Sequence, residues 1–401
     1  MLIVQKFGGS SVADAERIRR VAGIIAKTYQ DGNDIVVVLS AQGDTTDDLI
    51  AKAELINKKA SKREMDMLLS TGEQISVALC AMALEALGTP AVSLTGWQAG
   101  VQTTRQYGNS RIREINTERI YAELDRKRVV IVCGFQGSTT NGDITTLGRG
   151  GSDTSAVALA AKLKAGLCQI YTDVEGVYTA DPRIVPAAHK LNEITYDEML
   201  ELASLGAKVL HNRSVEMARK YGVKLEVLSS FTKQPGTIVK ERVKVEETKI
   251  SGLAKDSNIS RIALVGLRDE PGVAFRIFRM LAAKNINVDI ILQSIGRENS
   301  KDISFTVAKS DYEIAVAALN EEKDEIGFQS LDVSTTLAKV SIVGAGMINS
   351  SGVASMMFEA LYEAHVNIHM ISTSEIKVSV LIDEVNADAA MNAIHKKFFR
   401  D

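Results

Sequence analysis

The sequence predicts a three-layer α/β fold, in which helices cover both faces of a mainly parallel sheet, followed by two small α+β modules. Short apolar runs alternate with longer helical patterns from residue 1 to about residue 230. The apolar runs are rich in Val and Ile and show no polar alternation, which is typical of parallel strands that are buried on both faces. Beyond residue 250, one segment of the sequence is repeated.

The first part of the chain alternates strands and helices in a regular order. The predicted helices cover 14–29, 64–87 and 152–165, and the predicted strands cover 2–7, 35–40, 91–96, 129–135, 169–174 and 224–230. Strands that alternate with helices of this length form βαβ units and a parallel sheet. We therefore expect one α/β domain over residues 1–235, followed by a charged linker over 236–249.

The C-terminal part contains two copies of one pattern. Residues 272–294 align without a gap with residues 352–374, and Gly272/Gly352 is among the identical pairs. Each copy predicts the order strand, helix, strand, strand, helix. Two copies are too few for a stacked solenoid, so a pair of small α+β domains is the better interpretation.

The two copies differ at their ends. The first module (261–336) continues into a possible closing strand at 328–334, whereas the second (337–401) ends directly after its last helix. A spare strand at 250–260 precedes both copies. It could complete the second module, and the first module would then be an insertion within the second. A glycine-opened helix at a sheet edge can hold the charged ends of an amino acid, although a duplicated module without a ligand is the alternative.

Composition excludes several classes of protein. The net charge is −3 and no run of Lys or Arg stands out, so nucleic acid is not an expected partner. The three cysteines are widely spaced in apolar stretches, which predicts buried thiols and a reducing, cytoplasmic location. The first residues lead straight into a strand and no long uninterrupted apolar segment occurs, so we expect neither export nor membrane insertion.

A glycine-rich turn follows the first predicted strand. There Lys6 precedes Phe7, Gly8, Gly9 and Ser10. Glycines let backbone N–H groups approach phosphate oxygens closely, the lysine supplies a cation, and the N-terminus of a following helix adds a favourable dipole. The turn is therefore a predicted phosphate site, although similar turns occur in many α/β proteins that bind no phosphate.

Two further clusters carry polar side chains in turns. The first, TTLGRGGSDT (145–154), places Arg149 between glycines, where its planar guanidinium suits a carboxylate or phosphate. Asp153 in the same cluster could simply cap the following helix. The second cluster, 172–183, begins at the end of a predicted parallel strand with Asp173, and open α/β sheets bind ligands at that edge. Its Glu-Gly and Asp-Pro-Arg sequences are also ordinary turns.

Taken together, these motifs resemble those of aspartate kinases, within the amino-acid kinase superfamily. The resemblance covers essentially the whole chain and includes KFGGSS (6–11), SAQGDTTD (40–47), REMDMLLSTGEQ (63–74), TTLGRGGSDT (145–154) and YTDVEGVYTADPR (171–183). The two C-terminal copies resemble paired ACT domains, including VGAGM (343–347) and ISTSEI (371–376). The resemblance implies an amino-acid kinase fold followed by two βαββαβ ACT domains.

The resemblance also implies an activity. Such an enzyme would use ATP and Mg²⁺ to phosphorylate the side-chain carboxylate of L-aspartate, the first step toward lysine, threonine and methionine. Lysine, threonine or both would act as feedback effectors at the ACT domains. The ACT domains would also form a homo-oligomer, or a hetero-oligomer with a C-terminal regulatory fragment.

Individual roles follow from the matching motif positions. The implied catalytic residues are Lys6, Asp153 and Arg149. Aspartate would be bound by Thr46, Glu73, Arg149 and Ser152, with Glu73 taking the ammonium group and Arg149 a carboxylate. The implied ATP-binding residues are Lys6, Phe7, Gly8, Gly9, Ser10, Thr172, Asp173, Tyr178, Arg183 and Lys208. No metal site built from protein side chains alone is expected, since Mg²⁺ would arrive with ATP.

The effector site is implied at the start of the first helix of each ACT copy and on the facing strand. These residues are Asp269, Gly272, Val273, Ala274, Asn287, Asp289, Gln293, Ser351, Gly352, Val353, Ala354 and Ser374. The second copy lacks the acidic residue and has Ser351 where the family usually has proline. We therefore expect the two copies to be used unequally.

Two departures from the family pattern affect local geometry only. Asn212 stands where proline is common, and we expect it to cap the following helix instead. Gln42 stands where methionine is usual. Two other functions remain to be distinguished: a glutamate or N-acetylglutamate kinase of the same superfamily, and a non-catalytic amino-acid sensor on a degenerate kinase scaffold.

Overall fold

The computed structural model describes residues 1–207, 209–242, 250–294 and 300–399. Within these ranges the chain forms two compact units. The first unit holds most of the chain up to residue 242, and the second holds Thr179–His189 together with most of the chain from residue 250 onward. Each unit has its own sheets and its own core.

The first unit is built on an eight-stranded sheet in the order β10-β12-β11-β9-β1-β2-β6-β3. Every neighbouring pair is parallel except β11 with β12. The prediction of a mainly parallel sheet is therefore confirmed. The strands are β1 (Leu2–Phe7), β2 (Asp34–Leu39), β3 (Ala91–Leu94), β6 (Val129–Cys133), β9 (Leu167–Thr172), β10 (Glu193–Thr195), β11 (Leu225–Ser229) and β12 (Thr237–Lys240).

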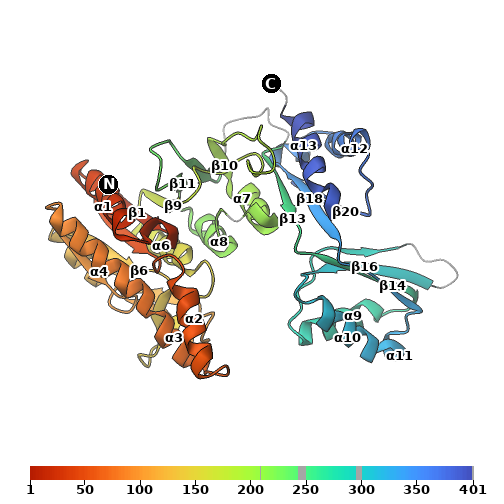
Figure 1. Cartoon of the computed structure of the whole chain (residues 1–401), viewed down its shortest axis with the longest axis horizontal. Helices are drawn as coiled ribbons and strands as arrows, with labels where there is room; N and C mark the ends of the chain where they lie inside the picture. The colour runs from red at the N-terminus through yellow and green to blue at the C-terminus, as the bar shows by residue number, and fades with distance from the viewer. Residues whose placement is uncertain (208, 243–249, 295–299, 400–401) are drawn as a thin grey trace. The chain divides into compact units, whose positions relative to one another are not determined.

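Helices cover both faces of this sheet (Figure 1). On one face, α1 and α4 pack together over β2, whose Ile35, Val37 and Leu39 belong to the same buried cluster as the apolar sides of both helices. The alternate residues Val36 and Val38 point to the other face, on which α6 packs against β1, β2 and β9. The helices are α1 (Ala15–Gln30), α2 (Thr45–Ile56), α3 (Lys62–Leu69), α4 (Thr71–Ala86), α5 (Glu118–Asp125), α6 (Gly151–Leu163), α7 (Tyr196–Leu202) and α8 (Asn212–Tyr221).

The predicted helix over 64–87 is two helices, α3 and α4, which meet at Ser70. The Ser70 carbonyl accepts a hydrogen bond of 2.8 Å from the Gln136 side chain, which joins this junction to the strand that carries Gln136. The combined stretch Lys62–Ala86 is long and apolar enough to cross a membrane, and 44% of its apolar 18-residue segment is buried. Core helices of soluble proteins meet the same criterion, and α4 packs on α1, β3 and β6.

A second, smaller sheet lies beside the main one and was not predicted. Its order is β5-β4-β7-β8, and its strands have three or four residues each. Strands this short give too little alternation for the sequence to reveal them. They are β4 (Val101–Thr103), β5 (Ile112–Ile115), β7 (Gln136–Ser138) and β8 (Ile144–Thr146).

The second unit contains two four-stranded sheets of the predicted α+β type (Figure 1). One has the order β15-β16-β14-β17 and the other β13-β18-β20-β19. The strands are β13 (Gly252–Asp256), β14 (Ser260–Arg268), β15 (Ile291–Gln293), β16 (Ser300–Val307), β17 (Ser330–Ser334), β18 (Leu337–Val343), β19 (Met370–Ser374) and β20 (Lys377–Asp383). The helices are α9 (Val273–Ala283), α10 (Tyr312–Glu321), α11 (Lys323–Ile326), α12 (Val353–Glu363) and α13 (Ala387–Phe398).

The two modules are interleaved along the chain. β13 pairs antiparallel with β18 from Gly252↔Val343 to Asp256↔Lys339, so it adds a strand to the second module. The whole first module lies between these two strands in the sequence, and β17 closes it by pairing with β14. The boundaries at 261–336 and 337–401 remain predictions, while the strand pairing gives the second module four strands.

The segment Thr179–His189 packs in the second unit although it lies within the predicted 1–235 domain. Its Ala180 and Val185 are buried in the same apolar cluster as α12 and α13. The Leu253 N–H donates to the Thr179 carbonyl at 2.7 Å, and the Thr179 hydroxyl is 2.9 Å from His395 Nε2. The 1–235 domain is therefore not continuous in space, because these side chains complete another core.

One buried carboxylate in the first unit gives a stability prediction. Glu123 on α5 is 1% exposed and is paired with Arg119, Arg126 and Arg128 at 2.9, 3.5 and 3.0 Å. The variant Glu123→Gln leaves three guanidinium groups without their counter-charge and should destabilise the protein by about 1–3 kcal/mol. Urea unfolding measures this change. The exposed pair of Glu16 with Arg20 provides the control, because Glu16→Gln should cost less than about 0.5 kcal/mol; equal midpoints for the two variants would contradict the prediction.

Candidate functional site

Loops from several strands meet at the carboxyl edge of the eight-stranded sheet. The chain passes from β1 to β2 on one side of β1 and reaches β9 on its other side, so the strand order reverses next to β1. Open α/β sheets bind their ligands at such a reversal. The loops are joined by backbone hydrogen bonds from Gly8 to Tyr171, from Gly43 to Gly9 and from Ser230 to Thr172.

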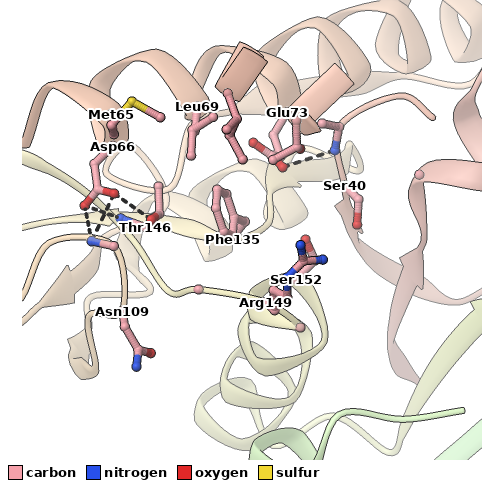
Figure 2. A pocket seen from close by; sticks show the side chains of 18 of the residues that line it. Ser40, Met65, Asp66, Leu69, Glu73, Asn109, Phe135, Thr146, Arg149 and Ser152 are labelled. Atoms are coloured by element: carbon pink, nitrogen blue, oxygen red, sulfur yellow. Dashed lines mark hydrogen bonds between the residues drawn. The ribbon is translucent and has the colours of Figure 1, made fainter. Parts of the chain in front are cut away.

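A cavity of about 740 Å³ opens at this edge (Figure 2). Eight of the predicted site residues line it, although they come from four separate places in the sequence. They are Lys6, Gly8, Gly9, Thr46, Glu73, Arg149, Ser152 and Asp153. The structure therefore brings together the predicted catalytic and aspartate-binding residues around one space.

Lys6 and Asp153 form an ion pair inside the cavity. Lys6 Nζ lies 2.6 Å from Asp153 Oδ1, and both side chains are largely buried. Lys6 is on β1 and Asp153 is in the first turn of α6, so the pair joins the sheet to the helix that packs on it. Asp153 does not cap α6, because the capping position belongs to Gly150. The pair instead fixes the lysine ammonium group beside Gly8.

The glycine-rich turn after β1 takes a shape that only glycine permits. A Cβ atom on Gly9 would lie 2.7 Å from the carbonyl oxygen of Ala41. The turn continues as a short 3₁₀ helix, Gly9–Val12, and α1 begins only after it, with Asp14 as its own cap. The N-terminus of α1 therefore does not directly follow the turn, and the expected favourable dipole from this helix does not apply to it. Lys6 and the backbone N–H groups of the turn remain the candidate phosphate-binding features.

Glu73 carries a buried carboxylate with unused hydrogen-bonding capacity. Only 3% of the residue is exposed, and one oxygen accepts the Ala41 N–H at 3.1 Å. The other oxygen has no hydrogen-bond partner among the described residues. Burial raises the pKa of Glu73 to about 7, and the hydrogen bond from Ala41 opposes this change. A cation placed in the cavity would satisfy the free oxygen and restore the ionised form.

Arg149 lies in a loop shaped by two glycines in the left-handed region. Gly148 has φ of 80° and Gly150 has φ of 68°, and a Cβ atom on Gly150 would collide with the His211 ring. The guanidinium of Arg149 is exposed and forms no ion pair or hydrogen bond with any residue that the structure describes. An unpaired guanidinium at the cavity wall is available for an anionic ligand.

Several cavity residues were missed by the sequence analysis. They include Ser40, Met65, Asp66, Asn109, Phe135 and Thr146. Phe135 has φ of 65°, which is rare for an aromatic residue and is stabilised here by hydrogen bonds from Leu147 and to Ser155. Asp66 is fully buried and hydrogen-bonded to Thr146 and Gly108. Asp66 belongs to the REMDMLLSTGEQ motif, but no property of the sequence separates it from its exposed neighbours.

Of the predicted nucleotide residues, only Lys6, Gly8 and Gly9 are among those that line the cavity. Phe7 is buried and stacks on Tyr171 with ring centres 4.4 Å apart, so it can offer a ligand only its backbone. Thr172 is the last residue of β9, and Asp173 and Tyr178 lie in the segment that follows. None of these three residues is among those that line the cavity, and neither is Ser10. Arg183 belongs to the second unit, where it pairs with Asp181. Lys208 lies outside the described residues.

The predicted effector residues lie at the expected element ends of the second unit. Gly272 and Gly352 precede α9 and α12, both with positive φ. Val273 and Val353 are buried in the cores of their modules, so their side chains cannot contact an effector. Asn287, Gln293, Ala274, Ser351 and Ser374 are exposed or half-buried. Asp269 is 2.9 Å from Lys301, and Asp289 forms an ion pair with the buried Lys339 of β18.

The two departures from the family pattern have defined roles. Asn212 is the first residue of α8, and its side chain donates to Ser204 Oγ at 2.8 Å, so the expectation that it caps the helix is wrong. His211 occupies the capping position without a side-chain bond. The Gln42 side chain donates to the Val12 carbonyl at 2.8 Å and thereby holds the turn after β1.

The titratable groups elsewhere fit a structural role. All three cysteines are buried and free, and burial raises the pKa of the Cys80 thiol to about 12. Within the described ranges, no group of three His, Cys, Asp or Glu side chains is arranged to hold a metal ion.

Comparison with protein families divides the chain in the same way. Residues 1–229 match the amino acid kinase family, and residues 262–322 and 340–398 match the ACT domain. An aspartokinase of Mycolicibacterium smegmatis is 51% identical over 403 residues, covering 99% of this chain and 96% of the relative.

Solved structures show the same similarity. A structure of E. coli aspartokinase III in complex with aspartate and ADP, described as an R-state, has a TM-score of 0.82 and 27% identity, with full coverage of both chains. A structure of the same protein with lysine and aspartate, described as a T-state, has a TM-score of 0.79 and 27% identity, again over both whole chains.

Proposed function

The chain belongs to the aspartate kinase family, and we infer that it transfers the γ-phosphoryl group of ATP to the side-chain carboxylate of L-aspartate. The observation that carries this function is the pairing of unsatisfied charges in one cavity. Among the described residues, Glu73 offers a buried free oxygen, Arg149 offers an unpaired guanidinium, and Lys6 lies beside a glycine-rich turn. An amino acid has an ammonium group and carboxylates that match the first two, and a polyphosphate matches the third.

Each residue then has a role in substrate binding. Glu73 takes the ammonium group of aspartate, and Arg149 takes a carboxylate through two parallel hydrogen bonds. The hydroxyls of Thr46 and Ser152, which also line the cavity, orient the substrate between these charges. Lys6 and the glycine-rich turn of Gly8 and Gly9 hold the transferring phosphoryl group, and Asp153 orients Lys6.

The chemistry requires little beyond positioning and charge compensation. A carboxylate with an ordinary pKa is ionised at neutral pH, so an oxygen of the aspartate side chain can attack the γ-phosphorus without a general base. A bond forms between this oxygen and phosphorus while the bond from phosphorus to the oxygen of ADP breaks. The barrier arises because an anion approaches a polyanion, so the cationic groups of Lys6 and Arg149 contribute most.

Mg²⁺ bound to ATP fits the donor set of the cavity. Nucleotide-bound Mg²⁺ takes several ligands from phosphate and water and needs only one or two protein carboxylates. Asp153 is a carboxylate at the right place, beside Lys6 and the glycine-rich turn. When bound, the ion would neutralise charge on the phosphates. Thr172, at the end of β9, and Asp173 and Tyr178, which follow it in the sequence, would contribute to the nucleotide site.

The C-terminal modules would regulate this reaction as effector-binding ACT domains. Lysine, threonine or both would bind at the start of α9, where Asp269 can receive an ammonium group and the N–H groups after Gly272 can receive a carboxylate. The asymmetry between the modules supports unequal use, since the second has Ser351 and no acidic residue at the matching place. Such regulation suits the first step of a route to lysine, threonine and methionine, in the cytoplasm.

Association of the modules would complete the regulatory half. β15 and β19 are edge strands of their sheets, and both expose apolar side chains, namely Ile291, Leu292 and Ile371. An exposed apolar edge strand favours pairing with another chain. The partner would be a second copy of this chain or a C-terminal regulatory fragment that carries the same modules.

Turnover with a panel of acceptors tests the function directly. With MgATP, we expect ADP release with L-aspartate and little release with glutamate or N-acetylglutamate, because Glu73 and Arg149 fix the ammonium and one carboxylate at a set distance. A coupled assay of ADP release measures this. Preference for glutamate or N-acetylglutamate would assign the chain to another branch of the superfamily, and no turnover with any acceptor would favour a non-catalytic sensor.

Aspartate affinity should depend on pH through Glu73. Its pKa of about 7 in the free protein means that the carboxyl group is mostly protonated at pH 6 and mostly ionised at pH 8. Only the ionised form attracts an ammonium group, so affinity should rise about tenfold between these pH values. Calorimetric titration with L-aspartate measures the change. The variant Glu73→Gln should bind more weakly and lose this pH dependence; an unchanged profile would exclude Glu73 as the ammonium ligand.

Effector sensing should depend on Asp269. The variant Asp269→Ala removes the acidic group at the start of α9 and should weaken inhibition by lysine or threonine by about tenfold or more, since a charge-assisted hydrogen bond is lost. Inhibition curves at fixed substrate concentrations measure the effect. The adjacent Glu270, which pairs with Arg276, provides a matched control through Glu270→Ala. Equal inhibition of both variants and the unsubstituted chain would rule out the assignment to Asp269.

A further inference from the structure

Asp66 forms a dense set of hydrogen bonds at the wall of the cavity (Figure 2). It lies on α3 and is fully buried. Its carboxylate accepts the N–H of Gly108 at 2.9 and 3.1 Å, the N–H of Thr146 at 3.0 Å and the hydroxyl of Thr146 at 2.7 Å. Each carboxylate oxygen therefore has two short contacts, and the donors come from the loop at 106–110 and from the end of β8.

The charge of Asp66 is balanced by these donors. Within the described ranges, no Lys, Arg or His forms an ion pair with it. A buried carboxylate without a cationic partner is costly unless several donors point at it. An ionised carboxylate accepts at both oxygens, whereas an amide has one acceptor and would direct its own N–H groups at the donors on the other side. The site is therefore specific for a carboxylate.

Arg213 of α8 also contacts the loop at 106–110 and the residue that follows β8. Its guanidinium donates to the Leu147 carbonyl at 3.0 Å and to the Ser110 carbonyl at 2.9 Å. Ser110 in turn donates to the Thr146 carbonyl through both its N–H and its hydroxyl. The loop at 106–110 and the end of β8 are thus fixed to each other and to two helices.

These contacts control the loop that carries Arg149. Thr146 stands three residues before Arg149 in the sequence. Gly148, between them, lies close to the Asn109 side chain, since a Cβ atom added to Gly148 would be 3.1 Å from Asn109 Oδ1. The Arg149 side chain has no described partner of its own, so its position depends on the backbone beneath it. Lys6, Gly8 and Gly9 are carried by β1 and its turn, and Asp66 makes no hydrogen bond with them.

We propose that Asp66 is a positioning residue for the acceptor side of the reaction. By holding Gly108 and Thr146, it sets the place at which Arg149 receives the carboxylate of aspartate. This inference rests on the proposed function of the cavity. The proposal predicts different effects on the two substrates. Loss of the Asp66 contacts displaces Arg149, which binds aspartate, and leaves the turn of Gly8 and Gly9, which binds phosphate, in place.

The variant Asp66→Asn tests the proposal. The KM for aspartate should rise at least about tenfold, because a small displacement of a substrate-binding group lowers the population of productive complexes, whereas the KM for ATP should stay within about twofold. Calorimetric binding of L-aspartate should weaken in parallel, which provides a readout that does not depend on turnover. Glu123→Gln is the matched control, since it also changes a buried carboxylate to an amide but lies outside the cavity.

The possible outcomes are distinct. If Asp66→Asn and Glu123→Gln both lower the unfolding midpoint while neither changes the KM for aspartate, Asp66 is merely structural and the proposal fails. If Asp66→Asn does not fold, the pair Thr146→Val and Thr146→Ser replaces it. The valine variant loses the hydroxyl that donates to Asp66, whereas the serine variant keeps it, so the valine variant should have the higher KM for aspartate. Equal KM values for the two variants would overturn the proposal. Absence of aspartate turnover in the unsubstituted chain would contradict the proposed function instead.

Discussion

Lys6 at the end of β1 and Asp153 at the start of α6 form an ion pair of 2.6 Å, and the rest of the site is arranged around it. The pair exists because β1 is central in the sheet and α6 packs directly on β1, β2 and β9. Parallel pairing of these strands brings their carboxyl ends to one edge. Residues as distant in sequence as Gly9, Glu73 and Arg149 therefore line one cavity.

Groups of opposite charge line that cavity. Glu73 is buried with an oxygen that has no described partner, and burial raises its pKa because a carboxylate there lacks a cation. Arg149 has no partner among the described residues and lies on a loop that two glycines shape. The site thus contains polar groups without hydrogen-bond partners, and a bound zwitterionic amino acid would satisfy them. Asp66 and Arg213 use the opposite principle, since their hydrogen-bonding groups are engaged and the loops they hold gain rigidity.

Much of this arrangement could be predicted from the sequence. The alternation of apolar runs predicted the three layers, and the gapless alignment of 272–294 with 352–374 predicted the paired modules. The motifs predicted most of the charged residues of the cavity. The sequence did not predict the small sheet of β4, β5, β7 and β8, because strands of three or four residues carry no periodic signal. It also did not predict that Thr179–His189 would complete the core of the second unit.

By itself, the sequence determined which chemical groups the protein carries and in what order its elements follow. Lys6, Glu73, Arg149 and Asp153 are identifiable because their motifs place charged side chains beside glycines and strand ends. Only the tertiary structure decided what each group contacts. Asp66 and Thr146 meet although 80 residues separate them, β13 pairs with β18 across a whole module, and Phe135 takes a left-handed backbone conformation. Such contacts arise where packed elements bring distant parts of the chain together, and local residue preferences do not specify which distant residues will meet.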